Sequence, residues 1–535
     1  MDGPARPRSP HRARCMASSP LPPAACCAAA SARPNLMWIM ADDLGLGETG
    51  FARPHRPQPP HSNLRDISTP HLDAFARGAM TFDAAYAGYT VCAPSRTTLF
   101  TGRHSGHFVR VPTEPTLPER LRAAGYQTAA FGKSAPMDAP KGGTSWTPRV
   151  LEWGLPTLYG FDSFLGQPVQ TRGHNMYPAD VTDQTSVLPL PLNTKPKSRS
   201  LCMANPSAYN YTTDIFTAAA LRWLETGRTA SKPFFLYLSY TVPHAGGWGS
   251  WPRAPEDGNP VPSDLQYAAE LSWPEVERDH AASVSYLDAR IGEILRELER
   301  LELSSNTVVW FASDNGPHNE GGHSVDFFSS SGGLRGYKRS LYEGGVRSPS
   351  IVRWPGVTQS GSRSTTPWSF WDVLPTMMEI AGVKADANMY TTDSDVGVDA
   401  SAKRHGLDGR SIVPALRGES QPPPRYMFWT WRTAKTEAEE ASAHEVGSSF
   451  VGRNITVAAV PSGYAARMGD WKVVVHHCVD TRAVPSMDDV AELYHLPSDP
   501  GETKDMANCH KALVRSMLSI LADPKEALSC ACFQC

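Results

Sequence analysis

Short apolar runs alternate with longer amphipathic stretches through the body of this 535-residue chain. The apolar runs are strand candidates and cover residues 36–41, 127–131, 234–240 and 307–313. Helices are predicted where apolar side chains recur at helical spacing, over 212–225, 277–303 and 368–381. This alternation predicts an α/β domain with a largely parallel sheet flanked by helices.

Oxygen-bearing side chains stand where two of these runs end. Asp42 and Asp43 follow the first run, and Asp314 and Asn315 follow the last. Either pair alone is typical of a helix N-cap or a turn. Two adjacent carboxylates repel each other unless a cation or base lies between them, and hard oxygen donors suit Ca²⁺ or Mg²⁺ better than zinc. Catalytic groups gather at the carboxyl ends of strands in such sheets, so we expect one shared site, which also receives Lys133 and His244.

The segment 92–96 reads Cys-Ala-Pro-Ser-Arg, and 101–103 reads Thr-Gly-Arg. Taken alone, Cys92 would be a buried structural cysteine ahead of a helix. Flanked by the two oxygen-donor pairs, the segment resembles the C-x-P-S-R sequence of the sulfatases. The resemblance extends from about residue 34 to about residue 525. In sulfatases this cysteine is oxidised to formylglycine, whose hydrated aldehyde is the nucleophile.

The resemblance implies a sulfuric ester hydrolase with one divalent ion per chain, Ca²⁺ with Mg²⁺ as the alternative. The implied ligands are Asp42, Asp43, Asp314 and Asn315, together with residue 92. Family positions with catalytic roles map onto Cys92, Arg96, Lys133, His244 and Lys338. One hydroxyl of formylglycine would attack sulfur and expel the alcohol, and the second would lose its proton so that sulfate leaves. Lys338 and His244 are both candidates for the general acid.

The chain departs from the family pattern after Lys133. Many sulfatases read G-K-W-H-L-G there, and their histidine contacts a formylglycine hydroxyl. This chain reads Gly-Lys-Ser-Ala-Pro-Met over 132–137, so that histidine is absent. His318 follows the second ligand pair and is a candidate substitute, with a loop histidine bonded to the backbone as the alternative. The base for sulfate release therefore stays open.

The segments 159–166 and 174–178 resemble sulfatases of the arylsulfatase and N-acetylgalactosamine-6-sulfatase type. The resemblance implies a sulfated carbohydrate as substrate, with aryl sulfates as surrogates. Trp248, Trp251 and Trp273 are placed to stack on sugar rings, although packing is the commoner fate of tryptophan. Two alternatives remain: a phosphonate or phosphate ester hydrolase of the alkaline phosphatase superfamily, and a catalytically inactive binding protein with the same fold.

A second, smaller sheet is expected towards the C-terminus. Residues 385–405 are expected to form a surface loop, and the proline run 422–424 marks a boundary. Beyond it, 427–430, 473–475 and 492–502 resemble the small antiparallel sheet of sulfatases. We therefore predict a catalytic domain over 33–424 with an alkaline-phosphatase-like, mixed and largely parallel sheet, and a C-terminal antiparallel subdomain over 425–535.

Residues 1–32 differ from the rest: an arginine-rich start passes into an Ala- and Cys-rich stretch ending Ala-Ser-Ala. This resembles a signal peptide, with a transit peptide or a misjudged gene start as alternatives. Secretory entry would place the protein outside the cell or in a lysosome- or vacuole-like compartment, and would make the formylglycine-generating enzyme a partner. It would also make Asn210 and Asn454 glycosylation acceptors.

The cysteines and the overall charge add less. Besides Cys92 and the leader, the chain holds Cys202, Cys478, Cys509, Cys530, Cys532 and Cys535. The last three would form disulfides in a secreted protein and remain thiols in the cytosol. A net charge of −3 gives no reason to expect a nucleic-acid partner, and no apolar run approaches the length of a transmembrane helix.

Overall fold

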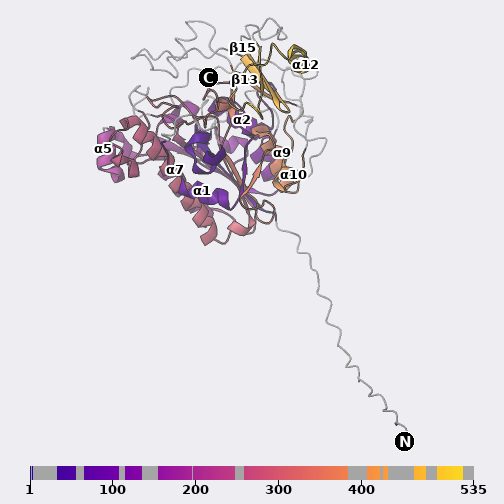
Figure 1. Cartoon of the computed structure of the whole chain (residues 1–535). Coiled ribbons are helices and arrows are strands. Elements are labelled where there is room, and N and C mark those ends of the chain that lie inside the picture. Colours follow the sequence, from indigo (N-terminus) through magenta and orange to yellow (C-terminus); the bar gives the residue numbers. More distant parts are fainter. Residues whose placement is uncertain are drawn as a thin grey trace, which may run out of the picture. The chain divides into compact units, whose positions relative to one another are not determined.

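The computed structural model describes residues 1, 3, 33–55, 65–107, 115–134, 155–195, 197–246, 258–383, 407–421, 426–431, 463–476 and 491–521. From Pro34 onward these residues belong to one compact unit. Helices surround its central sheet (Figure 1). The sheet has ten strands in the order β11-β2-β10-β9-β1-β8-β4-β5-β6-β7.

Four parallel strands form the middle of this sheet: β9 (Thr307–Ser313), β1 (Asn35–Asp42), β8 (Phe234–Pro243) and β4 (Gln127–Lys133). They confirm the four predicted strands. Strands β1, β8 and β9 are buried at every position, because helices cover both faces of the sheet. Their continuous apolar sequences follow from this two-sided burial.

Shorter strands complete the two edges and make the sheet mixed, as predicted. On the β9 side lie β10 (Ser350–Arg353), β2 (Met80–Phe82) and β11 (Ser362–Ser364), with β10 antiparallel to both its neighbours. On the β4 side lie β5 (Ser163–Gln167), β6 (Asp180–Asp183) and β7 (Ser186–Pro189). Strand β5 pairs parallel to β4, and the last two pairings are antiparallel.

Alternate residues of β1 supply two separate cores. Met37 and Ile39 pack with α1 (Pro70–Arg77), α6 (Thr212–Arg222) and α7 (Glu275–Arg300) on one face. Trp38 and Met40 pack on the other face. The helices there are α2 (Cys92–Thr101), α3 (Leu117–Ala123), α9 (Val373–Ile380) and α10 (Val413–Leu416). Two further short helices are α5 (Arg199–Ala204) and α8 (Glu343–Val346).

The helix predicted over 368–381 is wrong in its first turn. Residues Trp368–Ser369 form strand β12, which pairs with β3 (Ala85–Tyr86), and a 3₁₀ turn follows over Phe370–Asp372. The Asp372 carboxylate accepts the backbone N–H of Ser369 at 2.8 Å, which caps this turn. The α-helix therefore begins only at Val373. The other two predicted helices are confirmed with shifted ends, and a π turn over Trp223–Gly227 follows α6.

The predicted C-terminal antiparallel sheet is confirmed. It consists of β13 (Met427–Trp431), β14 (Gly463–Met468), β15 (Trp471–His476) and β16 (Ala491–His495). Helix α12 (Lys511–Leu521) packs against one face through Val514 and Met517. Trp429 on the other face joins a core cluster with Tyr86 and Trp371 of the main body. The proposed boundary at 424 and the loop over 385–405 lie outside the described residues.

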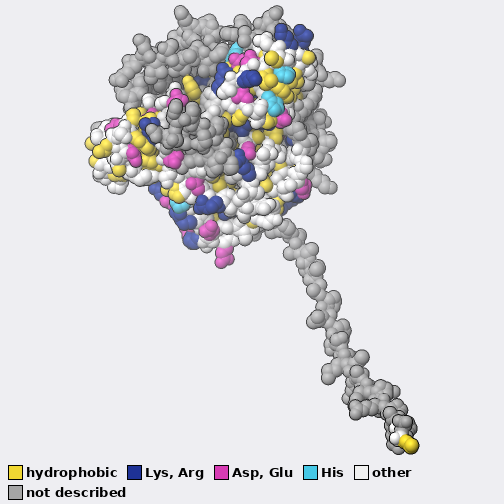
Figure 2. Space-filling model, in the orientation of Figure 1, with side chains coloured by type: hydrophobic (Ala, Val, Ile, Leu, Met, Phe, Trp, Pro, Cys, Tyr) yellow, Lys and Arg dark blue, Asp and Glu magenta, His cyan; other side chains and the backbone are white. Residues whose placement is uncertain are grey.

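On the face drawn in Figure 2, acidic and basic side chains are interspersed over the described surface. No helix of the described residues is long and apolar enough to cross a membrane.

Cys202 and Cys509 are free thiols, and Asn210 is half-buried. Cys478, Cys530, Cys532, Cys535 and Asn454 lie outside the described residues, so the disulfide expectation stays a prediction.

Candidate active site

Four neighbouring parallel strands end at one edge of the sheet, and their last residues bring the predicted groups together. The groups concerned are Asp42 on β1, Lys133 on β4, His244 after β8 and Asp314 after β9. All four side chains are buried. Parallel pairing puts these positions side by side although they come from distant parts of the sequence.

The oxygen-bearing residues form a connected cluster. The backbone N–H of Asp43 donates to Asp314 Oδ1 at 3.1 Å, and Asn315 Nδ2 donates to Asp43 Oδ1 at 2.7 Å. Asp43 adopts a left-handed backbone conformation with φ of 68°, which is uncommon for a residue with a side chain. The chain thus turns sharply at the end of β1 and keeps both carboxylates of Asp42 and Asp43 in the cluster.

This cluster fits a hard cation. Asp42 Oδ1 and Asn315 Oδ1 are buried and have no hydrogen-bond partner among the described residues. Burial, followed by the charge of Asp314, raises the pKa of Asp42 to about 7, and burial likewise raises the pKa of Asp43. Buried oxygens that lack donors are costly unless a ligand satisfies them. An oxygen-only donor set of this kind matches Ca²⁺ or Mg²⁺.

Two cationic side chains form ion pairs with carboxylates of this cluster. Lys133 Nζ lies 2.5 Å from Asp42 Oδ2, and Arg96 Nη2 lies 2.6 Å from Asp314 Oδ2. Arg96 also donates to Ser239 Oγ at 2.5 Å and to the carbonyl of Lys133. Burial opposes ionisation of Asp314, but Arg96 and Lys133 outweigh it and lower the pKa of this carboxyl. The guanidinium is therefore held rigidly at the strand ends.

Cys92 is the first residue of α2, so its side chain stands at the positive end of a ten-residue helix. Its Sγ and one ligand atom each of Asp42, Asp43 and His244 lie within 4.8 Å of one another. Burial, followed by the charge of Asp42, raises the pKa of the thiol well above its ordinary value. An unmodified Cys92 thiol would therefore stay protonated and be a poor nucleophile.

Lys338 connects this cluster to His244. Its Nζ lies 2.8 Å from Asp43 Oδ2, 2.9 Å from His244 Nε2 and 3.3 Å from Glu320 Oε2. Burial would lower the pKa of Lys338, but Asp43 and Glu320 raise it, so the ammonium stays charged. Lys338 then donates to His244 Nε2, and His244 Nδ1 donates to the carbonyl of Ala245 at 2.5 Å. Glu320 was missed by the sequence analysis, because no motif marks it.

His318 lies close to the cluster but faces the backbone. Its Nε2 lies 2.9 Å from the carbonyl of Pro243, and its Nδ1 accepts the backbone N–H of Glu320 at 3.1 Å. Burial, together with the charge of His323, lowers its pKa well below the ordinary value, so the ring is neutral. These contacts match the backbone-bonded alternative, and a catalytic role for His318 stays a prediction.

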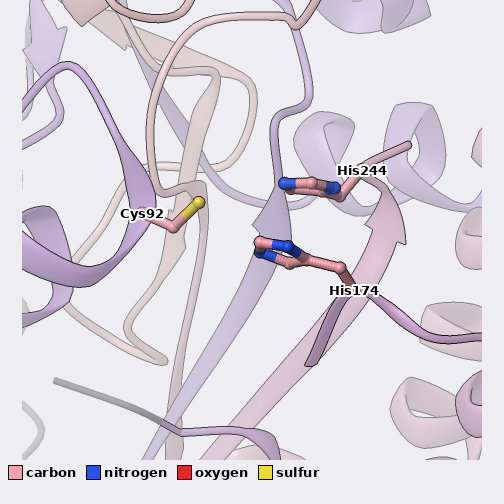
Figure 3. Close-up of side chains that lie close together, drawn as sticks. All are labelled: Cys92, His174 and His244. Carbon is pink, nitrogen blue, oxygen red and sulfur yellow. The ribbon is translucent and has the colours of Figure 1, made fainter. Parts of the chain in front are cut away.

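His174 is a second residue that the sequence analysis did not single out for catalysis. Its ring stacks on that of His244, with centroids 4.0 Å apart, and the two imidazoles lie beside Cys92 (Figure 3). Single ligand atoms of Cys92, His174 and His244 lie within 4.8 Å of one another. His174 ends the 3₁₀ helix η4 (Gln170–His174). A Cβ at Gly173 would lie 2.8 Å from Lys133 Cγ, so the glycine lets η4 approach the lysine closely.

The tryptophans proposed to contact sugars are not all placed. Trp248 and Trp251 lie outside the described residues. Trp273 packs among Tyr267, Phe327 and Phe328, with ring centroids between 5.2 and 5.8 Å away. This is the packing alternative, so Trp273 gives no support to a sugar-stacking role.

Comparison with known proteins agrees with this geometry. The family model described as Sulfatase matches residues 34–383. Human steryl-sulfatase is 26% identical over 465 residues, covering 73% of this chain and 71% of that protein. Mouse N-acetylgalactosamine-6-sulfatase is 25% identical over 516 residues, covering 88% of this chain and 81% of that protein. The crystal structure of Ps i-CgsB in complex with k-i-k-neocarrahexaose superposes with a TM-score of 0.65 at 21% identity, covering 93% of this chain and 94% of that one. The chain therefore belongs to the sulfatase family, has the alkaline-phosphatase-like fold of sulfatases and is a sulfuric ester hydrolase.

Proposed function

We propose that this sulfatase uses formylglycine made from Cys92 together with one Ca²⁺ ion, and that it removes sulfate esters from carbohydrates. One observation carries the proposal: Cys92 lies at the start of a buried helix, against a cluster in which two oxygens lack donors and whose carboxylates are paired with fixed cations. Asp42, Asp43, Asp314 and Asn315 would hold the ion. When bound, the ion would supply Lewis-acid polarisation and formylglycine a carbon bearing two hydroxyls.

The cations of the chain have separate roles in this proposal. Arg96 and Lys133 stabilise negative charge on the sulfate oxygens, since both are buried and held in place before substrate binds. Lys338 protonates the departing alcohol oxygen. We favour Lys338 over His244 for this role, because the His244 Nδ1 proton is bonded to Ala245 and its Nε2 accepts from Lys338.

His174 takes the role of the histidine that the chain lacks after Lys133. The contact of Gly173 with the Lys133 side chain and the ring stack on His244 place this imidazole beside Cys92. His174→Gln should lower kcat on an aryl sulfate about 10–100-fold and change the pH profile, with little effect on melting temperature. If His318→Gln causes this loss and His174→Gln does not, His318 is the base instead.

A sulfated carbohydrate is the substrate class that we favour. The mouse relative is named for an amino-sugar sulfate, and the superposed structure is a complex with a carrageenan-type oligosaccharide. A panel of sulfated mono-, oligo- and polysaccharides beside an aryl sulfate and an aryl phosphonate tests this choice. Sulfate release from aryl esters alone would contradict it, and faster phosphonate turnover would favour the phosphonate hydrolase alternative.

In this proposal, maturation requires the formylglycine-generating enzyme. We also propose that the protein enters the secretory pathway and is either secreted or kept in a lysosome- or vacuole-like compartment. The signal-like sequence of residues 1–32 and the C-x-P-S-R segment support this proposal. Peptide mass spectrometry across Cys92, on protein from its native host, should find the aldehyde. An intact, alkylatable thiol in active protein would contradict the mechanism, and an intact thiol in inactive protein would favour the binding-protein alternative.

A further inference from the structure

A second group of titratable side chains is buried outside the residues just described. Glu48 ends the 3₁₀ helix η1 (Leu46–Glu48), His280 belongs to α7, and His323 follows β9 and the Asp314-Asn315 pair. All three side chains have zero exposed fraction. Glu48 and His280 are 232 positions apart in the sequence, so the fold alone brings them together.

The Nε2 atoms of His280 and His323 are the ring nitrogens nearest to one oxygen of the Glu48 carboxylate. Their rings stack with centroids 3.7 Å apart and an interplanar angle of 8°. His280 Nε2 lies 2.6 Å and His323 Nε2 lies 3.9 Å from Glu48 Oε1. Single ligand atoms of the three residues lie within 4.8 Å of one another. The 2.6 Å contact is a hydrogen bond between His280 and Glu48, which an ion shared by the three residues would replace.

A fourth residue fixes the tautomer of His323. Its Nδ1 lies 2.6 Å from Glu277 Oε2, while Glu277 Oε1 accepts the backbone N–H of Ser324 at 2.9 Å. Nδ1 therefore carries the proton, and Nε2, which lies 3.9 Å from Glu48 Oε1, keeps its lone pair. That Nε2 is buried and has no hydrogen-bond partner among the described residues. A histidine whose far nitrogen donates to a carboxylate is the usual arrangement of a metal-bound histidine.

The charges of Glu48 and His323 are compatible with a bound cation. Burial opposes ionisation of Glu48, but His280 and His323 lower the pKa of its carboxyl, so it is ionised. Burial, together with His280, lowers the pKa of His323, because two stacked imidazoles cannot both be charged. The ionised Glu48 carboxylate therefore lies near the neutral ring of His323. A divalent ion between Glu48 and the two rings would balance the buried carboxylate charge.

We propose that Glu48, His280 and His323 bind one Zn²⁺ ion, with Glu277 positioning His323. Two imidazoles and a carboxylate favour zinc over calcium, in contrast to the oxygen-only cluster at Asp42 and Asp43. The ion would join η1, which follows Asp42 and Asp43, to α7 and to the loop that follows Asp314 and Asn315. It would thereby brace both segments that carry the proposed calcium ligands. This site does not depend on the proposed substrate or on formylglycine.

The test is elemental analysis of the full chain, produced without a polyhistidine tag and supplied with zinc during expression. Wild-type protein should retain about one zinc per chain after dialysis, and zinc X-ray absorption should show two imidazoles and oxygen. Glu48→Gln and His323→Gln should each reduce zinc at least about tenfold, while His495→Gln, on β16 and outside the cluster, should keep it. Calcium content in the same samples reports the other site separately, and Asp314→Ala should lose calcium but keep zinc.

Wild-type protein decides the question even if the variants fold poorly. Dipicolinate should lower its melting temperature by several degrees, and added zinc, but not calcium, should restore it. Wild-type protein that binds no zinc, or that keeps zinc in both Glu48→Gln and His323→Gln, would overturn the proposal.

Discussion

Two groups of buried charged residues in this molecule differ in whether all of their oxygens have partners within the chain. The strand-end cluster contains Asp42, Asp43, Asp314 and Asn315. The second group, here called the Glu343 network, lies between the main body and the C-terminal sheet. In it, Lys472 Nζ is 2.9 Å from both Glu343 Oε1 and Glu502 Oε1, and Arg347 Nε is 2.5 Å from Glu343 Oε2. Glu502 Oε2 also accepts the backbone N–H of Glu343 at 2.6 Å.

We interpret this difference as one between a proposed ligand site and a structural charge network. Each carboxylate oxygen of Glu343 and Glu502 lies within 2.9 Å of a cation or an N–H group of the chain, Glu502 Oε1 through its ion pair with Lys472. The strand-end cluster leaves Asp42 Oδ1 and Asn315 Oδ1 without partners among the described residues. Buried charges that the protein completes contribute to its packing, and those left incomplete indicate a ligand. Substitutions in the first group should therefore change activity, and substitutions in the second should change stability.

The largest effect should come from Cys92→Ser. A serine offers one hydroxyl and cannot eliminate sulfate, so multiple turnover should fall by at least about 10³-fold while the melting temperature stays unchanged. Aryl sulfate hydrolysis and circular dichroism measure the two quantities. Cys202→Ala, at a buried free thiol of the core, serves as the control and should keep kcat. Steady turnover by Cys92→Ser would show that residue 92 is not the nucleophile.

Asp314→Ala should come next, because it removes a proposed calcium ligand and the anchor of Arg96. We expect loss of bound calcium and a fall in kcat of about 10²–10³-fold. Glu343→Gln is the matched control, since it also removes a buried carboxylate but belongs to the Glu343 network. It should keep calcium and most of kcat while losing stability. Equal calcium loss in both variants would contradict the proposal that only the strand-end cluster binds the ion.

Lys472→Met tests the Glu343 network directly. It leaves Glu343 and Glu502 facing each other without their shared cation, so the free energy of unfolding should fall by about 3–5 kcal/mol. Adding Glu502→Gln should recover part of this loss, because one of the two charges is then removed. Urea unfolding gives the energies, and kcat of the folded enzyme should change less than about threefold. A large fall in kcat at full stability would place Lys472 in the catalytic machinery.

Much of this arrangement could be predicted from the sequence, because it depends on local periodicity. The four central strands are continuous apolar runs, and parallel pairing carries their polar end residues to one edge. Glu320, His174, Glu48 and His323 escaped prediction because they come from segments without such periodicity. His280 lies in the predicted helix 277–303, but only the fold brings it to Glu48 and His323. Their neighbours are set by long-range contacts, such as that of Gly173 with Lys133. The helix prediction for the first turn of 368–381 was wrong for the same reason, since pairing of Trp368 with β3 overrides helix propensity.

The smallest effect is a pH dependence of the Glu343 network. Burial, helped by the charge of Glu343, raises the pKa of Glu502 from 4.5 to about 7, whereas Lys472 and Arg347 outweigh burial at Glu343 and lower its pKa to about 2. A raised carboxyl pKa contributes stability that is complete below about pH 4.5 and is lost as pH rises through about 7. The contribution of Glu343 stays constant in this window, because it is lost only as pH falls towards 2.

Between pH 5 and pH 8 the free energy of unfolding of the wild type should therefore fall by about 2–3 kcal/mol relative to Glu502→Gln, which cannot ionise. Urea unfolding of both proteins at several pH values measures this difference and cancels the titration of other groups. Glu492→Gln is the control, because the pKa of Glu492 is lowered to about 2 and its ionisation is complete throughout the window. Parallel curves for wild type and Glu502→Gln would mean that Lys472 neutralises both carboxylates. The Glu343 network would then be fully balanced, and its contrast with the strand-end cluster would be larger than the pKa of Glu502 indicates.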